Sequence, residues 1–370
     1  MIKVLQFIHG LNTGGAETLV KNYSDFIDKS KFDVTVLCIE HFEDSPYEVY
    51  LKKRGVKVIY LCDEMRLYGK KGTAAKFINH YQLYMLIRRY IRQLEPDVIH
   101  VHLELNHYIK FARPKSGTKI VYTQHFALER LFTMFSKQVK YLRWIIKNYP
   151  TTLIALNQKM KQEMIDKFRT NNVVVINNGI DLERYHSGVN REEKRKELGL
   201  SKDAFIIVHV GRFNKIKNHD FLVEVFAEIK KKKEEAFLLM IGSGPIENSI
   251  REKLERLNLQ ENSLILNNRM DVPEILLAAD AAIFPSFSEG LGIAVIEMQA
   301  AGLPVVSSNG VPRDTQISNY IEYMDLSETP DKWADVLFEM LNYKKEFIFN
   351  GKDWNIRQNV KILEKIYEEN

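Results

Sequence analysis

Cysteine and long apolar runs are both scarce in this sequence of 370 residues. The only two cysteines, Cys38 and Cys62, lie inside or beside strand-like runs, so we interpret them as buried thiols in a reducing compartment and expect no disulfide. No segment reaches about 18 uninterrupted apolar residues, which argues against a membrane-spanning helix. The apolar run at 2–8 is broken by Lys3 and Gln6 and lacks the cationic start of a signal peptide. We therefore expect a cytoplasmic protein.

Several motifs that carry chemistry elsewhere are also missing. The sequence contains no C-x-x-C, H-E-x-x-H or D-x-D, so we expect neither a bound metal nor another cofactor. Its first glycine pair does not follow the spacing G-x-G-x-x-G, which removes the main support for a nicotinamide-dependent dehydrogenase. It shows no nucleic-acid recognition module, so nucleic acid is not an expected partner.

The composition and the length indicate a globular protein of two domains. Hydrophobic residues make up 45% of the sequence and charged residues 27%, as in ordinary globular proteins. A chain of this length exceeds what a single core usually supports. The net charge of +5 is unevenly divided, because residues 1–176 carry +12 and the remainder carries −7. An anionic partner is therefore to be sought on the first part of the chain.

Strand-like and helical segments alternate through both halves, as parallel α/β sheets require. The expected strands of the first half are 2–8, 33–39, 56–61, 97–102, 119–123, 152–156 and 173–176. Those of the second half are 205–210, 237–241, 263–266, 281–284 and 304–307, with helices at 218–232, 246–258, 273–279 and 292–301. A polar connector at 177–203 separates the two series, so the predicted fold class is α/β with two doubly wound domains. An amphipathic helix at 354–369 needs an apolar surface to cover.

Glycines and cations follow the first expected strand of each half. Ligands of open parallel sheets gather beyond the carboxyl ends of the strands, near helix N-termini. Gly14 and Gly15 open a helix after the first strand, where they indicate either a close approach to an anion or a plain tight turn. After the strand at 205–210, the cations Arg212, Lys215 and Lys217 precede a helix whose N-terminus is already partly positive. This arrangement favours a multiply charged anion over a solvated basic loop.

Two acids, Glu289 and Glu297, lie in a run that is otherwise almost wholly apolar or glycine. Buried carboxylates without partners cost several kcal/mol, roughly, so these two should face a polar ligand or accept hydrogen bonds. Carboxylates suit vicinal hydroxyls, which sugars and riboses offer. The alternative is structural, with Glu297 capping a neighbouring loop and Glu289 solvated.

Histidines occur at the same level of the first half. His100 and His102 end the strand at 97–102, and we favour a core role for His100. His125 lies in the loop after the strand at 119–123, where a role facing a ligand is expected.

These segments together resemble the retaining family 4 glycosyltransferases of the GT-B fold. The resemblance runs along the whole chain through GGAE, DVIHVH, VYTQHF, NNGIDLERY, GRFNKIKNH, IGSGP and the segment from RMDVPEILL to GLPVVSS. Its most specific element is the E-x7-E motif formed by Glu289 and Glu297.

The resemblance implies a role for each matching position. Arg212 and Lys217 would bind the donor diphosphate and stabilise it as the leaving group. Glu289 would hold hydroxyls of the transferred sugar, and Glu297 would accept from the ribose diol. The remaining implied positions are Arg269 near the base, the backbone amides of Gly290, Leu291, Gly292 and Ile293 near the sugar, Gly14 and Gly15 near phosphates or acceptor, and His102 and His125 on the acceptor side. Of these, His125 would lie at the reaction centre.

The GT-B fold implies two Rossmann-like domains that face a central cleft. The expected domains are 1–180 for the acceptor and 181–351 for the nucleotide sugar, with a closing helix in 352–370 that crosses back to the first. The family keeps the anomeric configuration, in the usual account by front-face substitution, with Glu289 as an alternative nucleophile. The resemblance predicts transfer of a hexose or N-acetylhexosamine, most simply from UDP, to a lipid-linked or saccharide acceptor in surface polysaccharide biosynthesis. The other candidates are a GT-B epimerase or phosphorylase and a non-catalytic nucleotide-sugar-binding protein.

The segment 110–147 is strongly basic, with nine lysines and arginines and a single acid, Glu129. Aromatic and aliphatic residues alternate with these cations, as on surfaces that bind anionic lipid headgroups. An ordinary helix that faces the core and has a basic outer side would give the same pattern. We expect a peripheral position on the inner face of the cell membrane.

Overall fold

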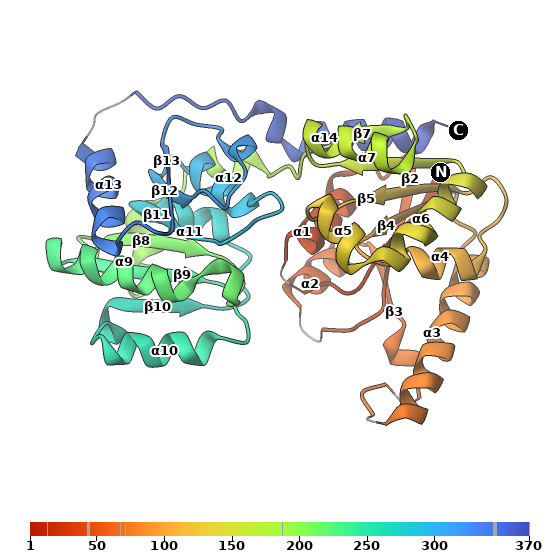
Figure 1. Cartoon of the computed structure of the whole chain (residues 1–370), viewed down its shortest axis with the longest axis horizontal. Helices are drawn as coiled ribbons and strands as arrows, with labels where there is room; N and C mark the ends of the chain where they lie inside the picture. The colour runs from red at the N-terminus through yellow and green to blue at the C-terminus, as the bar shows by residue number, and fades with distance from the viewer. Residues whose placement is uncertain are drawn as a thin grey trace. The chain divides into compact units, whose positions relative to one another are not determined.

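The computed structural model describes residues 1–12, 14–42, 45–66, 68–70, 72–186, 188–342 and 346–369. The chain divides into two compact units, of which the first combines Met1–Gly179 with Ile356–Asn370 and the second is Ile180–Asn355 (Figure 1). The chain therefore passes from one unit to the other at Gly179–Ile180 and at Asn355–Ile356. The second crossing falls four residues after the expected boundary at 351–352.

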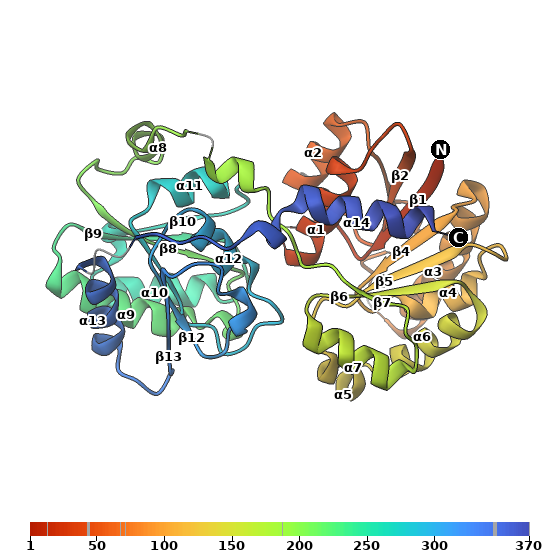
Figure 2. The same ribbon diagram turned by 90° about the horizontal axis from the view of Figure 1, so that it is seen from above.

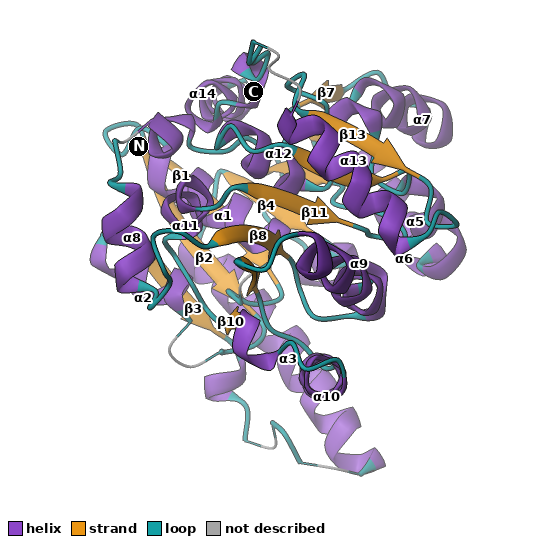
Figure 3. Ribbon diagram, turned by 90° about the vertical axis from the view of Figure 1, so that its left-hand side faces the viewer, coloured by secondary structure: helices purple, strands orange, loops and turns teal. Residues whose placement is uncertain are grey.

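The first unit is built on a parallel sheet of seven strands in the order β3-β2-β1-β4-β5-β6-β7. Figure 3 labels β1, β2, β3 and β4 of this sheet among the strands drawn in orange. Its strands are β1 (Ile2–Ile8), β2 (Phe32–Cys38), β3 (Lys57–Tyr60), β4 (Val98–His102), β5 (Lys119–Thr123), β6 (Thr151–Ala155) and β7 (Val173–Val175). Its helices are α1 (Gly15–Phe26), α2 (Pro46–Lys53), α3 (Thr73–Leu94), α4 (Asn106–Ala112), α5 (Leu128–Met134), α6 (Ser136–Asn148), α7 (Gln158–Phe168) and α14 (Ile356–Glu368). Every residue of β4, β5 and β6 is buried, because helices cover both faces of a parallel sheet.

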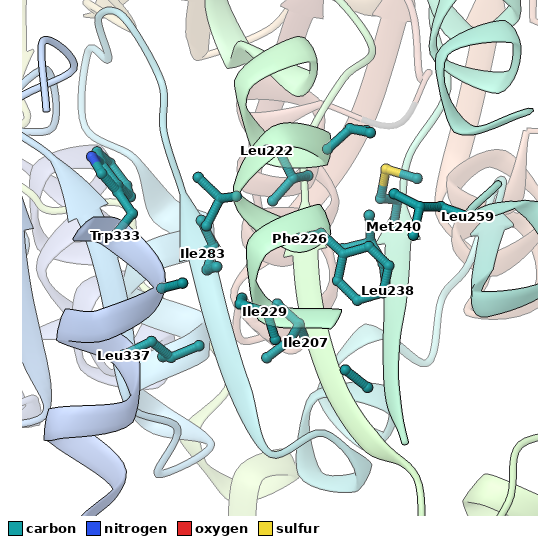
Figure 4. Packing of buried hydrophobic residues seen from close by; sticks show 14 of the residues in the cluster. Ile207, Leu222, Phe226, Ile229, Leu238, Met240, Leu259, Ile283, Trp333 and Leu337 are labelled. Atoms are coloured by element: carbon teal, nitrogen blue, oxygen red, sulfur yellow. The ribbon is translucent and has the colours of Figure 1, made fainter. Parts of the chain in front are cut away.

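The second unit is built on a parallel sheet of six strands in the order β10-β9-β8-β11-β12-β13. Its strands are β8 (Phe205–Val210), β9 (Ala236–Ile241), β10 (Ser263–Leu266), β11 (Ala281–Phe284), β12 (Val305–Ser308) and β13 (Ile321–Met324). Its helices are α8 (Arg191–Glu197), α9 (His219–Lys232), α10 (Glu247–Arg256), α11 (Val272–Ala278), α12 (Ile293–Ala300) and α13 (Pro330–Asn342). Leu222, Phe226 and Ile229 of α9 pack with Ile207, Ile283 and Trp333 in its core (Figure 4).

The last helix of the chain completes the core of the first unit. α14 lies along α1 (Figure 2). Ile356, Val360 and Leu363 of α14 are buried in one cluster with Val4 of β1 and Leu19 of α1. Its amphipathic pattern therefore faces an apolar surface built by residues more than 300 positions earlier in the chain.

Both cysteines are free and buried, with Cys38 at the end of β2 and Cys62 just beyond β3. No helix among the described residues is both long enough and apolar enough to cross a bilayer.

Candidate functional site

The two most informative loops of the second unit flank the point where its strand order reverses. β8 pairs with β9 on one side and with β11 on the other, so the connections run in opposite directions from β8. The loop after β8 carries Arg212 and Lys217, and the loop after β11 carries Glu289. Such a switch point is where ligands of doubly wound sheets bind, beyond the carboxyl ends of the strands. The fold thus brings residues more than 70 positions apart to one place.

Lys217 and Glu289 form an ion pair, with 2.7 Å between Nζ and Oε1. The exposed fractions of their side chains are 17% and 12%, so this pair is largely withdrawn from water. Ser286 donates its hydroxyl to the same carboxylate oxygen, and the lysine ammonium also lies over the ring of Phe284 at 4.7 Å. The sequence run around Glu289 contains no cation, and its partner comes from the neighbouring loop. The structure thus brings these two predicted site residues into direct contact.

Backbone contacts fix the loop that carries Glu289 between two neighbours. Phe287 donates its N–H to Ile216 O at 2.8 Å, and Glu289 donates its N–H to Gly310 O at 3.0 Å. A Cβ at Gly310 would lie 2.4 Å from Phe287 O, so only glycine permits this approach. The carboxylate of Glu289 is therefore held on a constrained loop.

The glycines of the IGSGP segment serve the loop that carries Arg212 and Lys217. A Cβ at Gly242 would lie 2.1 Å from Gly211 O, and one at Gly244 would lie 2.3 Å from Phe213 O. Gly242 also has φ +145°, which residues with side chains rarely adopt. These glycines let the loop after β9 pack against the loop after β8, backbone to backbone.

Glu297 lies on α12, and its carboxyl group faces Tyr185 of the segment Leu182–His186. Burial raises the pKa of Glu297 to about 7, and the neighbouring Tyr185 hydroxyl and Arg184 oppose that shift. Arg184 is itself paired with Glu274, at 2.8 Å and 3.0 Å from Nη2 to the two carboxylate oxygens. The pKa of Glu297 thus lies near neutrality, whereas Glu289 is held directly against the Lys217 ammonium.

Arg212 and Arg269 have contrasting surroundings. Arg212 is exposed, and within the described ranges its guanidinium makes no hydrogen bond or ion pair. Arg269 is instead bound by Asp271, with 2.7 Å from Nε to Oδ1, and by Glu197 at 3.2 Å. The charge of Arg212 is therefore available to an anion, whereas that of Arg269 is already matched, and the expected place of Arg269 at the base stays a prediction.

The amides expected near the sugar precede and begin α12. Gly292 has φ +82° and stands directly before the helix, and a Cβ there would meet Val311 Cγ1 at 3.2 Å. Leu291 is buried, and Gly290 and Ile293 are partly exposed. These four residues lie between Glu289 and Glu297 on one continuous loop-to-helix path.

In the first unit, His102 and His125 contact each other at the carboxyl ends of β4 and β5. The distance between His102 Nδ1 and His125 Nε2 is 3.0 Å. His102 is fully buried, and its other nitrogen lies 2.8 Å from Gln6 Oε1. Both nitrogens of His102 are thus occupied, so it reaches a ligand only through His125. His100 is also fully buried, bonded to Thr123 and Tyr367 in the core.

Gly14 and Gly15 stand at the N-terminus of α1. A Cβ at Gly14 would lie 2.4 Å from the Glu17 carboxylate, whereas one at Gly15 would meet no described atom within 4 Å. Packing within the unit therefore does not require glycine at position 15. The close approach of a ligand would explain why glycine is present there.

Sequence reasoning assigned no role to four polar residues that contact the histidines and carboxylates singled out above: Gln6, Tyr185, Ser286 and Tyr367. Ser286 lies within the E-x7-E region, and Tyr185 ends the NNGIDLERY segment, so both could have been found there. Gln6 is one polar residue in a buried strand, and Tyr367 lies on a helix whose partner surface no sequence pattern names. Among the described residues, no group of three or more His, Cys, Asp and Glu side chains is placed to hold a metal ion.

Comparison with known proteins identifies two domain families along the chain. Residues 13–184 match the model described as Glycosyltransferase Family 4, and residues 190–345 match the model described as Glycosyl transferases group 1. Their common limit falls beside the division between the two units.

Similar proteins span nearly the whole chain. A Bacillus subtilis (strain 168) protein named as a glycosyltransferase, EpsF, is 26% identical over 99% of this chain and 96% of its own length. An Escherichia coli protein named UDP-Gal:alpha-D-GlcNAc-diphosphoundecaprenol alpha-1,3-galactosyltransferase is 27% identical over 93% of this chain and 90% of its own. The crystal structure of Anabaena HepE with UDP and glucose superimposes with a TM-score of 0.69 at 17% identity, covering 99% of this chain and 95% of that one.

Proposed function

The chain belongs to the GT-B glycosyltransferases, with a family 4 domain followed by a group 1 domain, and from this premise we propose that it is a retaining hexosyltransferase. It would take a hexose or N-acetylhexosamine from a UDP-sugar and transfer it to a lipid-linked or saccharide acceptor of surface polysaccharide biosynthesis. The observation that carries the proposal is the ion pair of Lys217 and Glu289 at the switch point of the second sheet, with Arg212 on the same loop as Lys217 and unpaired among the described residues.

Arg212 and Lys217 supply the charge that the departing diphosphate needs. As the bond between the sugar C1 and the phosphate oxygen breaks, the leaving group gains negative charge, and two nearby cations stabilise it without a metal. The new bond forms between C1 and the acceptor oxygen, and the acceptor proton passes to the departing phosphate oxygen. Glu289 then holds hydroxyls of the sugar, and Glu297 accepts from the ribose diol.

His125 serves the acceptor side in this proposal, at the carboxyl end of β5. Burial lowers its pKa to about 3, so its ring stays neutral at physiological pH. A neutral imidazole can donate one hydrogen bond and accept another.

The names of similar proteins support the choice of donor and acceptor. HepE was crystallised with UDP, and the Escherichia coli relative is named for a UDP-sugar and a diphosphoundecaprenol acceptor. An acceptor of that kind is an anionic lipid, which suits the positive charge of residues 1–176.

Contact with a membrane surface is part of the proposal. Val139, Leu142 and Ile145 of α6 are buried, so the apolar side of this helix faces the core and its outer side is basic. Apolar side chains are exposed instead on α3, where Phe77 is 78% exposed and Tyr81 62%. We propose that the basic side of α6 binds anionic headgroups and that exposed aromatic residues of α3 add interfacial contact.

Co-sedimentation with vesicles tests the membrane contact. The triple change Lys137→Glu, Lys140→Glu and Arg143→Glu should abolish binding to anionic vesicles at low salt, because it reverses the charge of the outer side of α6. The matched control is Lys230→Glu with Lys231→Glu on α9, which should leave binding unchanged. Equal binding of the wild type to neutral and anionic vesicles would contradict an electrostatic contact.

Calorimetry with UDP tests the donor site. Lys217→Ala should weaken UDP binding by about 10- to 100-fold, the worth of one hydrogen bond to a charged group. Lys215→Ala, on the same loop and exposed, should change it by less than about twofold. Normal UDP affinity in Lys217→Ala would remove that lysine from the site. UDP binding without any transfer to lipid-linked or saccharide acceptors would favour a non-catalytic binding protein.

A further inference from the structure

A continuous chain of hydrogen bonds joins α14 to His125. Tyr367 Oη lies 2.6 Å from His100 Nδ1 and accepts from Gln6 Nε2 at 3.0 Å. Gln6 Oε1 lies 2.8 Å from His102 Nε2, and His102 Nδ1 lies 3.0 Å from His125 Nε2. Gln6, His100 and His102 are fully buried and Tyr367 is 3% exposed, so water does not replace these bonds.

The orientation of the Gln6 amide determines which atom donates and which accepts in each of these hydrogen bonds. Its oxygen can only accept, so His102 must carry its proton on Nε2 and leave Nδ1 as an acceptor. His125 must then donate from Nε2 to His102 Nδ1. The amide nitrogen of Gln6 can only donate, so Tyr367 accepts from it and directs its own proton to His100.

This series of hydrogen bonds ends at His125, where one ring nitrogen has no partner among the described residues. With its proton on Nε2, His125 has a bare Nδ1, and this nitrogen is buried with no hydrogen-bond partner in the described part of the chain. His125 follows β5 at the edge of the sheet where ligands of such folds bind. A buried acceptor without a partner is costly unless a ligand supplies the donor.

We propose that Tyr367 and Gln6 are positioning residues: they hold His125 as the Nε2–H tautomer, so that its Nδ1 accepts a hydrogen bond from a hydroxyl of the sugar or the acceptor. The inference rests on the proposed glycosyl transfer for the identity of that hydroxyl. Neither residue touches the substrate, and both act through His102.

Lys119 holds α14 at the place that this role requires. Its ammonium donates to Glu369 O at 2.7 Å and also to Ile366 O, which flank Tyr367 in sequence. The last helix therefore contributes a polar function as well as apolar cover.

Two variants interrupt this series of hydrogen bonds at different residues. Tyr367→Phe removes the hydroxyl that the Gln6 amide donates to, so the amide is free to turn and donate to His102, which reverses the proton positions as far as His125. Gln6→Met removes the amide with little change of volume. Tyr23→Phe is the matched control, because Tyr23 is fully buried beside His100 and its hydroxyl has no hydrogen-bond partner among the described residues.

The decisive readout is the tautomer of His125, observed by nitrogen-15 NMR of the imidazole rings in the full-length protein without substrates. The wild type and Tyr23→Phe should show Nε2–H, whereas Tyr367→Phe and Gln6→Met should show Nδ1–H or a mixture. In transfer assays, kcat of both variants should fall by about 2- to 10-fold, the effect of one neutral hydrogen bond, with KM for the donor within about twofold.

An Nδ1–H tautomer in the wild type, or an unchanged tautomer and kcat in both variants, would overturn the inference. So would a changed tautomer with an unchanged kcat. The NMR measurement needs no activity, so a wild type that transfers no sugar would count against the proposed function and leave the tautomer result to decide the role of Tyr367.

Discussion

The ion pair of Lys217 and Glu289 couples a side chain expected at the diphosphate to one expected at the sugar. Without a donor, the lysine ammonium and the carboxylate satisfy each other at 2.7 Å. A bound diphosphate would compete with Glu289 for the ammonium, and the carboxylate would then turn to sugar hydroxyls. Without a donor, the pair thus keeps the charges of two largely buried side chains neutralised. A bound donor would give each of them its own partner, the diphosphate for Lys217 and sugar hydroxyls for Glu289.

Glu289→Gln separates these two tasks. UDP should bind at least as tightly as to the wild type, because Lys217 no longer gives up a carboxylate, while transfer should fall by about 100-fold or more through weakened bonds to the sugar. Calorimetry and a transfer assay measure the two effects. Glu328→Gln, which changes an exposed acid of the same unit, should alter neither. Much weaker UDP binding in Glu289→Gln would show that Glu289 does not compete for Lys217.

Glu297 should make both stability and nucleotide binding depend on pH. Its pKa is about 7 in the folded protein against an ordinary value of 4.5, so the folded state retains a proton that the unfolded state loses. The free energy of unfolding should therefore fall, relative to Glu297→Gln, by about 1.4 kcal/mol per pH unit as the pH rises from 4.5 to 7. Denaturation at a series of pH values measures the difference.

The same ionisation prepares Glu297 to accept from the ribose diol. The affinity for uridine should rise as the pH increases from 6 to 8 in the wild type and stay flat in Glu297→Gln. Uridine is the better probe, since it lacks the titrating phosphate of UDP. Parallel pH profiles of the two proteins would place Glu297 outside the ribose contact.

At the scale of elements, two glycines at carboxyl-end loops differ in the reason for their presence. Gly242 is required by packing, because a Cβ would lie 2.1 Å from Gly211 O and its φ is +145°. Gly15 meets nothing in its own unit. Gly242→Ala should therefore lower the free energy of unfolding by at least about 1–3 kcal/mol, whereas Gly15→Ala should fold with unchanged stability or a gain of up to about 1 kcal/mol.

A stable Gly15→Ala variant can still lose activity. If a ligand approaches the start of α1, Gly15→Ala weakens transfer although the protein is stable, as thermal unfolding and steady-state kinetics on the same sample would show. Full activity in Gly15→Ala would mean that the glycine pair forms only a tight turn.

The sequence predicted regular elements more fully than contacts between them. Every expected strand lies within one residue of its predicted ends, because short buried parallel strands bounded by polar turns have a strong pattern. β13 was not predicted, since IEYM shows neither a continuous apolar run nor a clean alternation. The partner of Glu289 and the face covered by α6 depend on neighbours distant in sequence, which no local pattern encodes.

At the scale of the whole molecule, the stability of the first unit should depend on residues at the far end of the chain. Leu363 of α14 is fully buried in the core of the first unit, and Leu337 of α13 is fully buried in the core of the second. Leu363→Ala should cost about 2–5 kcal/mol and Leu337→Ala a similar amount, each in its own unit.

Hydrogen exchange shows which unit loses stability in each variant. Leu363→Ala should speed exchange in β1 and α1, and Leu337→Ala should speed it in β8 and α9. Faster exchange of the second sheet in Leu363→Ala would contradict the division of the chain at Asn355 and Ile356.

The two crossing segments run side by side, with Ile180 N–H donating to Trp354 O at 2.7 Å and Asn359 Nδ2 donating to Asn177 O at 2.7 Å. The second unit is thus an insertion within the first, and this arrangement sets an order of events at the ribosome. The core of residues 180–355 can form before that of the first unit, because residues 1–179 lack their covering helix until Ile356–Glu368 has been synthesised. Until then, Val4, Leu19 and Tyr23 lack the part of their cluster that Ile356, Val360 and Leu363 supply. Synthesis of α14, rather than emergence of residues 1–179, therefore completes the core of the first unit.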